Sequence, residues 1–521
     1  MGSAVRAHIR SSSVVAALAV MASASAQVPI GQAPVKSELP PPRITAMSSA
    51  PPIIAIGWED VVATSEVNAT TQIGSAGSGP LHDKVYQELR DFNPEYPRWQ
   101  LWGGGAKDPN LGNAEVLPPA NGVSHWDFSK IDPGFITFVN TVQGHQFLVD
   151  LEVTPDWMYK PNPAIAASTL GPLARVHTKR ELAVKPQEFA DYYARVVSWW
   201  EKGGFMDEFG KWHPSGHHFK IPYWEVLNEI EFEHHWTPQE YTKFYDSVTA
   251  AMRKVDPNIK FVALALAAPS KHPEMFEYFL NPANHRKGAP LDFISYHFYA
   301  SPSPDQTLDD WQYTFFDQAE GFLNTVRYVE QIRKRLSPST KTDLDELGVI
   351  LPEDGKEIRQ PGYVAKPEPQ NYWNLDGAMY AYIYEETAKM GIDVLGESQL
   401  VGYPSQYPSV SMMNYNTAEP NPRFWVLKLL KDHFGPGDKL VDTTNPNESL
   451  SVQAFETKQG KSLLVINKRN RAEQITLPAE ADGAAISLVA PSTGDHAPAQ
   501  ETLHGRILSL QPFEVAVLQY K

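Results

Sequence analysis

The sequence contains no cysteine, which excludes disulfide bonds, thiolate catalysis and thiolate-bound metals. Basic residues are outnumbered by acidic ones, so the formal net charge is −16. Because nucleic-acid binding depends on neutralising phosphates with lysine and arginine, this balance argues against a nucleic-acid partner. Simple solubility explains the acidic charge equally well. Long apolar runs are also missing, and no stretch is long and apolar enough to span a bilayer as a helix.

The remaining composition is typical of a large folded protein. The chain has 521 residues, of which 42% are hydrophobic and 20% charged, with 13 tryptophans and 22 tyrosines. This length fits two or three domains, although a single barrel of strands and helices takes about 250 residues by itself. The 44 prolines indicate many defined loops rather than one disordered tail.

The N-terminus is typical of a secretory signal peptide. A basic start containing Arg6 and Arg10 precedes a short apolar run over Val14–Ala22. Ala24-Ser25-Ala26 is an A-x-A cleavage site, so we expect a signal peptide at residues 1–26 and a secreted or periplasmic protein. Residues 27–50 are rich in proline, alanine and serine, and we expect a linker or N-terminal arm there.

Residues 92–436 alternate short apolar runs with amphipathic patterns, which is typical of βα units and a parallel sheet. The expected strands are 97–102, 114–118, 146–153, 223–229, 260–266, 292–299, 342–350 and 392–399. The expected helices are 186–202, 238–255, 321–336, 375–390 and 422–433. Thr237-Pro238 and Asn421-Pro422 each place a cap residue before a proline at the first helical position.

Eight such units predict an α/β fold, a TIM (β/α)8 barrel. An open doubly wound sheet is the alternative, but Gly103-Gly104-Gly105 lacks the G-x-G-x-x-G spacing expected of its phosphate-binding turn. After residue 437 the pattern changes to short alternating strands separated by turns, which predicts an accessory C-terminal antiparallel β-sandwich domain over 437–521. In residues 51–91 we expect a lead-in helix and a strand near Ile53–Trp58 that joins this sandwich.

The active site of a TIM barrel lies at the carboxyl ends of its strands. The expected fourth strand ends in Asn228-Glu229, which places a carboxyl group at the barrel mouth, where desolvation suits a general acid. The expected seventh strand contains Glu346, three βα units of roughly 30–40 residues further on. The two carboxylates can therefore face each other across the lumen. A surface glutamate or a helix-capping acidic cluster is the simpler alternative for each.

Other strand ends carry further candidates. His297 and Tyr299 end the sixth strand on one face, Trp157 follows the strand over 146–153, and Glu397 ends the eighth. Strand alternation predicts that Asp343 and Asp345 point away from Glu346.

Glu225 lies on the same face as Glu229, one layer deeper. Adjacent pairs such as His217-His218 and His234-His235 do not converge on one ion, so no metal is expected, and a substrate contact by these pairs stays open. The sequence has no G-x-S-x-G elbow and no P-loop.

Together these segments resemble glycoside hydrolase family 39, which includes β-xylosidases and α-L-iduronidases. Residues 224–229 resemble the strand-four motif of clan A glycosidases, and residues 294–299 are similar to the strand-six signature of family 39. Asp345-Glu346 resembles the nucleophile segment of the iduronidase branch. Residues 154–158 and Arg98 resemble a loop and a barrel-floor arginine of the family. The sequence departs from the family pattern at Ile230, where proline is usual, and at residues 343–345.

The resemblance implies a retaining glycosidase with Glu346 as nucleophile and Glu229 as acid/base, and with no cofactor. Asn228, His297, Tyr299, Trp157, Arg98 and Glu397 would then form the sugar subsite, with Tyr299 hydrogen-bonded to Glu346. The implied partner is a carbohydrate substrate. We expect an exo-acting, β-xylosidase-like enzyme. Two other classes stay open: a non-catalytic carbohydrate-binding protein on a degenerate barrel, and an envelope structural or adhesion protein.

Overall fold

The structure, a computed structural model, describes residues 50–74, 82–100, 114–152, 154–163, 179–354, 367–402 and 408–521. The chain divides into a first unit, residues 1–50, and a second, compact unit, residues 51–521. The expected signal peptide and nearly all of the expected linker lie outside the described residues, and both stay predictions. All the elements below belong to the second unit.

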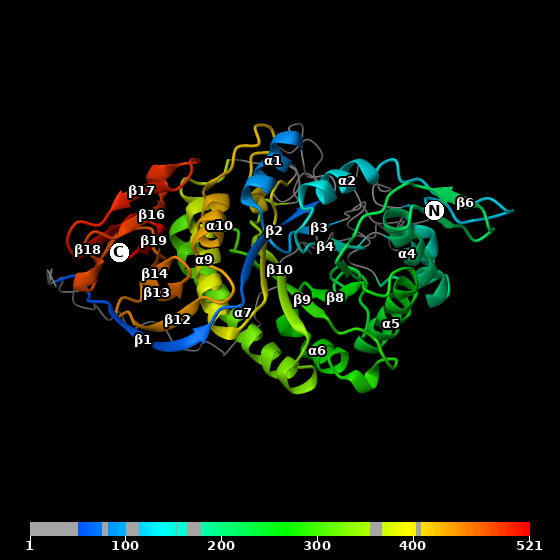
Figure 1. Cartoon of the computed structure of the whole chain (residues 1–521), viewed down its shortest axis with the longest axis horizontal. Helices are drawn as coiled ribbons and strands as arrows, with labels where there is room; N and C mark the ends of the chain where they lie inside the picture. The colour runs from blue at the N-terminus through cyan, green and yellow to red at the C-terminus, as the bar shows by residue number, and fades with distance from the viewer. Residues whose placement is uncertain are drawn as a thin grey trace, which may run out of the picture. The chain divides into compact units, whose positions relative to one another are not determined.

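Eight parallel strands close into a barrel, which confirms the predicted TIM fold (Figure 1). In order around the barrel they are β2 (Asn68–Gly74), β3 (Arg98–Gln100), β4 (Leu148–Asp150), β7 (Tyr223–Glu225), β8 (Lys260–Leu266), β9 (Phe293–Ala300), β10 (Lys341–Val349) and β11 (Val394–Glu397). Neighbouring strands follow chain order, as expected when crossover segments connect consecutive parallel strands.

The first barrel strand differs from the prediction. β2 pairs in parallel with β3 and β11, so the barrel begins at Asn68 rather than at residue 92. The predicted strand over 114–118 forms only an isolated bridge between Glu115 and Trp126. β2 reads Asn-Ala-Thr-Thr-Gln-Ile-Gly, and all but Asn68 is buried. Gln72 contacts Arg98 in the lumen, while Thr71 bonds the Glu397 carbonyl of the neighbouring strand. The strand therefore lacks the apolar run by which the others are recognised.

Helices accompany the barrel strands: α1 (His82–Phe92), α2 (Asp132–Thr141), α4 (Pro186–Glu201), α5 (Pro238–Val255), α6 (Pro273–Phe279), α7 (Leu308–Leu336), α9 (Tyr372–Met390) and α10 (Pro422–His433). The two predicted proline starts are those of α5 and α10. Thr237 Oγ1 accepts a 3.2 Å hydrogen bond from the Glu240 N–H, and Asn421 Oδ1 accepts a 3.0 Å bond from the Arg423 N–H. These side chains satisfy amide groups that a helix leaves unpaired at its first turn.

A second sheet follows the barrel. Seven strands run in the order β1 (Ala55–Thr64), β12 (Lys439–Thr444), β13 (Leu450–Thr457), β14 (Gly460–Asn467), β19 (Val515–Gln519), β16 (Ala485–Val489) and β17 (Ala499–Thr502), and every pair is antiparallel. β15 (Glu473–Thr476) and β18 (Ile507–Leu510) form a small separate sheet. β1 precedes the first barrel strand in the sequence, yet it belongs to this sheet and pairs with β12.

The seven-stranded sheet buries both of its faces. One face forms an apolar core with β15 and β18, which includes Val452, Leu488 and Leu508. The other face joins the main core, where the rings of Phe434 after α10 and Phe455 on β13 lie 4.5 Å apart. Among the described residues, no helix is both long and apolar enough to cross a membrane.

Candidate active site

The barrel lumen is built in layers along its strands. Because side chains alternate between the two faces of a strand, β9 turns every second residue inward. Phe293 belongs to an apolar floor that also contains Leu148, Tyr223, Val262 and Val394. Above it Ser295 donates a 2.5 Å hydrogen bond to Glu225, His297 contacts Glu229, and Tyr299 contacts Glu346. The polar groups therefore gather above an apolar floor, toward the carboxyl ends of the strands.

A β-bulge in β10 places Glu346 in this lumen. Against β9 the register passes from Asp343↔Ser295 to Glu346↔His297, and a matching shift occurs against β11, so β10 carries one extra residue. Bulges of this kind re-aim side chains next to active sites. The bulge also breaks the alternation that predicted Asp345 to point away. Asp345 Oδ2 instead lies 3.2 Å from Nε of Arg98, and this part of the prediction was wrong.

Glu346 is held by a dense set of donors. Its Oε1 accepts a 2.6 Å hydrogen bond from Arg98 Nη1, and its Oε2 accepts a 2.7 Å bond from the Tyr299 hydroxyl. Nδ1 of His297 lies 3.6 Å from Oε2. Burial alone would raise the pKa of the Glu346 carboxyl, but His297, Arg98 and Tyr299 together hold this pKa below its usual value. Glu346 is therefore a carboxylate at neutral pH.

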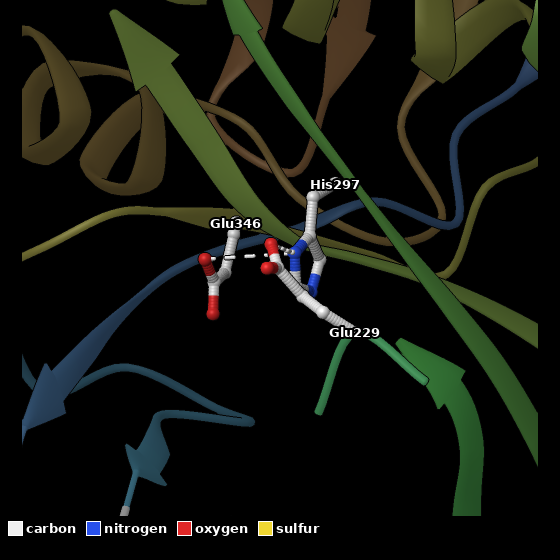
Figure 2. Close-up of side chains that lie close together, drawn as sticks. All are labelled: Glu229, His297 and Glu346. Atoms are coloured by element: carbon white, nitrogen blue, oxygen red, sulfur yellow. Dashed lines mark hydrogen bonds and ion pairs between the residues drawn. The ribbon is translucent and has the colours of Figure 1, made fainter. Parts of the chain in front are cut away.

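Glu229 faces Glu346 across the lumen, and His297 lies between them. Nδ1 of His297 is 3.0 Å from Oε1 of Glu229. One oxygen of each glutamate and one nitrogen of the histidine all lie within 4.8 Å of one another (Figure 2). Burial alone would lower the pKa of His297, but the carboxylates of Glu346 and Glu229 raise it above its usual value. The geometry thus brings the predicted pair together around one shared imidazole.

The backbone at the end of β7 is bent to present Glu229. Leu227 and Glu229 have φ angles of +66° and +43°, a left-handed conformation that non-glycine residues seldom adopt. The Glu229 N–H donates 2.9 Å to the Ala265 carbonyl of β8, which holds the bend in place. Strained positions of this kind concentrate at functional sites because the surrounding structure over-determines them.

The residues beneath the pair position it. Asn228 Oδ1 accepts a 3.0 Å hydrogen bond from Arg98 Nη2, and its amide lies 3.5 Å from Glu233 Oε1. Glu225 is fully buried and pairs with Arg98 at 2.6 Å. Glu225 therefore holds Arg98 from the layer below the two reacting carboxyl groups. Arg98, 2% exposed, also lies below the mouth, where it orients Glu346 and Asn228.

Glu397 is not brought to the site. It ends β11 with its side chain directed outward, where Oε1 lies 2.6 Å from Nε of Arg423 on α10. Asp376 of α9 contacts the same guanidinium at 2.9 Å. Burial raises the pKa of Glu397 to about 8, with Arg423 opposing. The structure does not place Glu397 in the expected subsite, because Val394 belongs to the apolar floor of the lumen and the two-residue alternation of β11 then turns Gly396 inward and Glu397 outward.

Trp157 lies in the short helix η1 (Asp156–Met158) after β4, and its indole N–H donates 3.0 Å to the Glu115 carbonyl. It is half-buried against the main core. Its described contacts do not reach the two glutamates, so a sugar contact by Trp157 stays a prediction.

Several polar residues of the site were not predicted from the sequence. Gln72 on β2 accepts from Arg98 Nη1 at 2.6 Å and donates 2.7 Å to Ser398, whose hydroxyl lies 2.8 Å from that of Tyr299. Gln100 on β3 lies 3.4 Å from Glu346. Each of them is close to the carboxyl end of a barrel strand, and that position is the one signal that could have found them.

The three groups around His297 also have the composition of a metal site. A divalent cation there would lie close to the Arg98 guanidinium, which is 2.6 Å from Glu346, and like charges at such distances repel. The imidazole would also have to give up its contact with Glu229. The arrangement therefore fits proton transfer and nucleophilic attack better than metal coordination.

A closed βα barrel with one carboxylate just after the fourth strand and another on the seventh, facing each other, has the arrangement that glycoside hydrolysis requires. Residues 187–346 match the model of glycosyl hydrolases family 39, which confirms the resemblance seen in the sequence. This segment runs from α4 to β10 and contains both Glu229 and Glu346.

Solved structures share the fold. The GH51 arabinofuranosidase from Xanthomonas axonopodis pv. citri aligns with a TM-score of 0.59 and 13% identity, over 90% of this chain and 99% of its own. The GH30 endoxylanase from Clostridium papyrosolvens C71 aligns with a TM-score of 0.54 and 14% identity, over 89% and 98% of the two chains. The GH51 α-L-arabinofuranosidase from Thermotoga petrophila RKU-1 aligns with a TM-score of 0.55 and 17% identity, over 90% of this chain and 99% of its own. No curated protein sequence matches the chain.

Proposed function

We propose that the protein is an exported, retaining glycoside hydrolase that releases xylosyl, arabinosyl or related residues from the ends of plant or microbial glycans. The observation that carries this proposal is the Glu229–Glu346 pair, whose oxygens approach within 4.8 Å. Retaining glycosidases hold their two carboxyl groups about 5–5.5 Å apart, whereas inverting ones leave roughly 6.5–9.5 Å for a water molecule. The spacing thus favours double displacement.

In the first step Glu346 attacks the anomeric carbon and forms a glycosyl-enzyme ester, while protonated Glu229 donates its proton to the leaving oxygen. In the second step Glu229, now ionised, takes a proton from water. The water oxygen attacks the anomeric carbon, and Glu346 leaves as a carboxylate. Arg98, Tyr299 and His297 support these roles because they hold the pKa of Glu346 low.

His297 links the two roles. Its Nδ1 lies 3.0 Å from Glu229 and 3.6 Å from Glu346, so one imidazole responds to the charge of both carboxyl groups. When Glu346 forms the ester and loses its charge, the imidazole is left with Glu229 as its carboxylate neighbour on Nδ1. Glu229 becomes anionic in the same step, and a cationic His297 stabilises that charge.

Export and substrate rest on different observations. The basic start, apolar run and A-x-A site at residues 1–26 support export. The resemblance to β-xylosidases supports exo-action on xylosyl residues. Because the chain shares its fold with arabinofuranosidases as well as with an endoxylanase, we include arabinosyl residues among the proposed substrates.

A panel of 4-nitrophenyl glycosides tests the proposal, with xyloside, arabinosides, galactoside, glucoside and uronides in both anomeric forms. We expect turnover of a pentoside, with release of a product whose anomeric configuration is that of the substrate when followed by NMR. A first product with the opposite configuration would contradict retention. Saturable sugar binding by calorimetry without turnover of any glycoside would favour the non-catalytic binding protein.

A further inference from the structure

Arg98 has no hydrogen-bond donor left for a substrate. A guanidinium carries five N–H groups, and here Nε donates to Glu225, Nη1 to Gln72 and Glu346, and Nη2 to Asp150 and Asn228, at distances from 2.6 to 3.2 Å. The side chain is 2% exposed. It is therefore a saturated internal counterion, unable to pair with a carboxylate on an incoming sugar.

His297, the other cationic candidate at this level, is 1% exposed and lies against carboxyl groups of the protein. Its Nδ1 lies 3.0 Å from Oε1 of Glu229, and its Nε2 lies 3.4 Å from Oδ1 of Asp345. Among the described residues, the contacts of the catalytic glutamates include no further arginine, lysine or histidine. In the part of the chain that the structure describes, a uronic acid bound here would meet the carboxyl groups of Glu346 and Asp345 and no unpaired cation, and burying an unpaired carboxylate strongly weakens binding.

An unused carboxyl group lies at the mouth of β4. Leu148 belongs to the apolar floor and Asp150 contacts Arg98, so the period-two alternation turns Glu152 inward one layer higher. The Leu151 N–H still pairs with the Glu225 carbonyl at 3.1 Å, which continues the alternation past the end of the strand. Glu152 is 9% exposed, and its Oε2 has no hydrogen-bond partner.

Glu233 lies close enough to Glu152 for its charge to raise the pKa of Glu152. Its N–H donates 2.7 Å to the Glu229 carbonyl, so it is anchored to the residue that carries the acid/base carboxyl. Burial, and then the negative charge of Glu233, raise the pKa of Glu152 above its usual value. Burial, and then the charge of Glu229, raise that of Glu233. Protonated carboxyl groups both donate and accept hydrogen bonds, which is what sugar hydroxyls require.

We propose that the enzyme accepts an uncharged glycone and excludes uronic acids, and that Glu152 with Glu233 binds the hydroxyl groups of that glycone. This inference rests on the proposed glycosidase function and narrows its substrate class. It separates the chain from the α-L-iduronidase branch, which Asp345-Glu346 resembles in sequence. The partner it selects is a neutral pentose or hexose whose hydroxyls exchange hydrogen bonds with the two carboxyl groups.

Matched aryl glycosides test the exclusion. The 4-nitrophenyl β-D-xyloside, β-D-glucoside and β-D-glucuronide differ only at C5, and the α-L-arabinopyranoside, β-D-galactoside and β-D-galacturonide form a second such series; α-L-iduronide completes the set. We expect kcat/KM for the best neutral substrate to exceed that of every uronide by at least about 100-fold, as expected for an unpaired charge in a built site. A uronide turned over as fast as its neutral partner overturns the inference and leaves the glycosidase function intact.

If no glycoside is hydrolysed, the proposed function fails, and the charge selection is decided by binding. Calorimetry with xylose, glucose and glucuronate then compares the same sugars on the wild-type protein. Weaker binding of glucuronate than of the neutral sugars supports the inference, and equal or tighter binding overturns it.

Two substitutions test the role of Glu152. The amide of Glu152→Gln keeps a donor and an acceptor, so we expect KM for the best neutral glycoside to rise only about threefold, whereas Glu152→Leu removes both and raises KM at least about thirtyfold. The effect falls on KM more than on kcat, since Glu152 touches neither reacting carboxyl. Equal kinetics of the two variants contradicts the role.

The matched control is Glu201→Gln, which replaces another buried carboxyl group. Glu201 lies on α4, outside the lumen, and accepts a 3.2 Å hydrogen bond from the Trp224 indole that a glutamine oxygen can also accept. We expect this variant to keep the KM and kcat of the wild type. Circular dichroism and the Tm of each variant separate a lost contact from a lost fold.

Discussion

The hydroxyl of Tyr299 donates a 2.7 Å hydrogen bond to Oε2 of Glu346, and its oxygen lies 2.8 Å from the Ser398 hydroxyl. Tyr299 ends a row of inward side chains on β9, and Glu346 is turned toward it by the bulge in β10. The contact is one of the causes that hold the pKa of Glu346 below its usual value. It therefore links the shape of the barrel to the protonation state of the proposed nucleophile.

We expect Tyr299→Phe to lower kcat/KM about 10- to 100-fold, because a hydrogen bond to a charged group contributes about 1.5–3 kcal/mol. The acid limb of the pH–kcat/KM profile should move to higher pH by about one unit, since losing the donor raises the pKa of Glu346. Tyr380→Phe is the control, because the Tyr380 hydroxyl bonds the Leu395 carbonyl away from the lumen. An acid limb that stays in place in Tyr299→Phe would contradict the proposed role.

The two glutamates should respond differently to an external nucleophile. Glu346→Ala and Glu229→Ala should each lower kcat at least about 10³-fold, as expected when one member of a catalytic unit is removed. Azide should then restore turnover in both variants, with a glycosyl azide of inverted configuration from Glu346→Ala and of retained configuration from Glu229→Ala. NMR of the azide products distinguishes the two. Wild-type activity in both variants would refute the assignment, and exchanged product configurations would reverse the two roles.

The sequence was most informative where local chemistry decides the structure. The starts of α5 and α10 could be predicted to the residue because a capping side chain followed by proline is a local signal. Glu229 could be found because a polar residue that ends an apolar strand is conspicuous, and Glu346 because it lies three βα units further along the chain. His297 and Tyr299 followed from the two-residue period of β9.

The remaining features depend on the closed barrel. β2 escaped prediction because its buried side chains include Thr70, Thr71 and Gln72, and only the neighbouring strands supply partners for such polar groups. The bulge at Asp345 arises from how β10 pairs with both of its neighbours, and the local sequence does not determine that pairing. The position of Arg98 could be predicted from the sequence. That residues from several different strands accept all of its hydrogen bonds could not.

Glu397 provides a direct check of the corrected register. Its carboxyl faces Arg423 and Asp376 between the barrel and its helices. We expect Glu397→Gln to change kcat/KM less than about threefold. Because burial raises the pKa of Glu397 to about 8, the Tm should fall mainly above that pH, where a buried arginine loses a charged partner, a change that costs about 3–5 kcal/mol when no group replaces it. A glutamine oxygen replaces it in part, so the loss should be at the lower end. A selective rise in KM at unchanged Tm would instead place Glu397 in the sugar subsite.

The buried carboxyl groups predict how stability varies with pH. Burial raises the pKa of Glu397 and Glu115 to about 8 and that of Glu201 to about 7, well above the ordinary value near 4.3 that each takes in the unfolded chain. Between about pH 4.5 and pH 8 the folded protein therefore binds more protons than the unfolded one, and its free energy of unfolding falls as the pH rises.

We therefore expect the free energy of unfolding, measured in urea, to be larger at pH 5.5 than at pH 8.5. The lowered pKa of Glu346 acts with the opposite sign, but its contribution is lost only as the pH falls below about 4.5, outside this window. Glu201→Gln removes one titrating group and should flatten the slope above pH 5 by at most about 1.4 kcal/mol per pH unit. Stability that rises with pH across this window would mean that these carboxyl groups are ionised in the folded protein and held by their cationic neighbours.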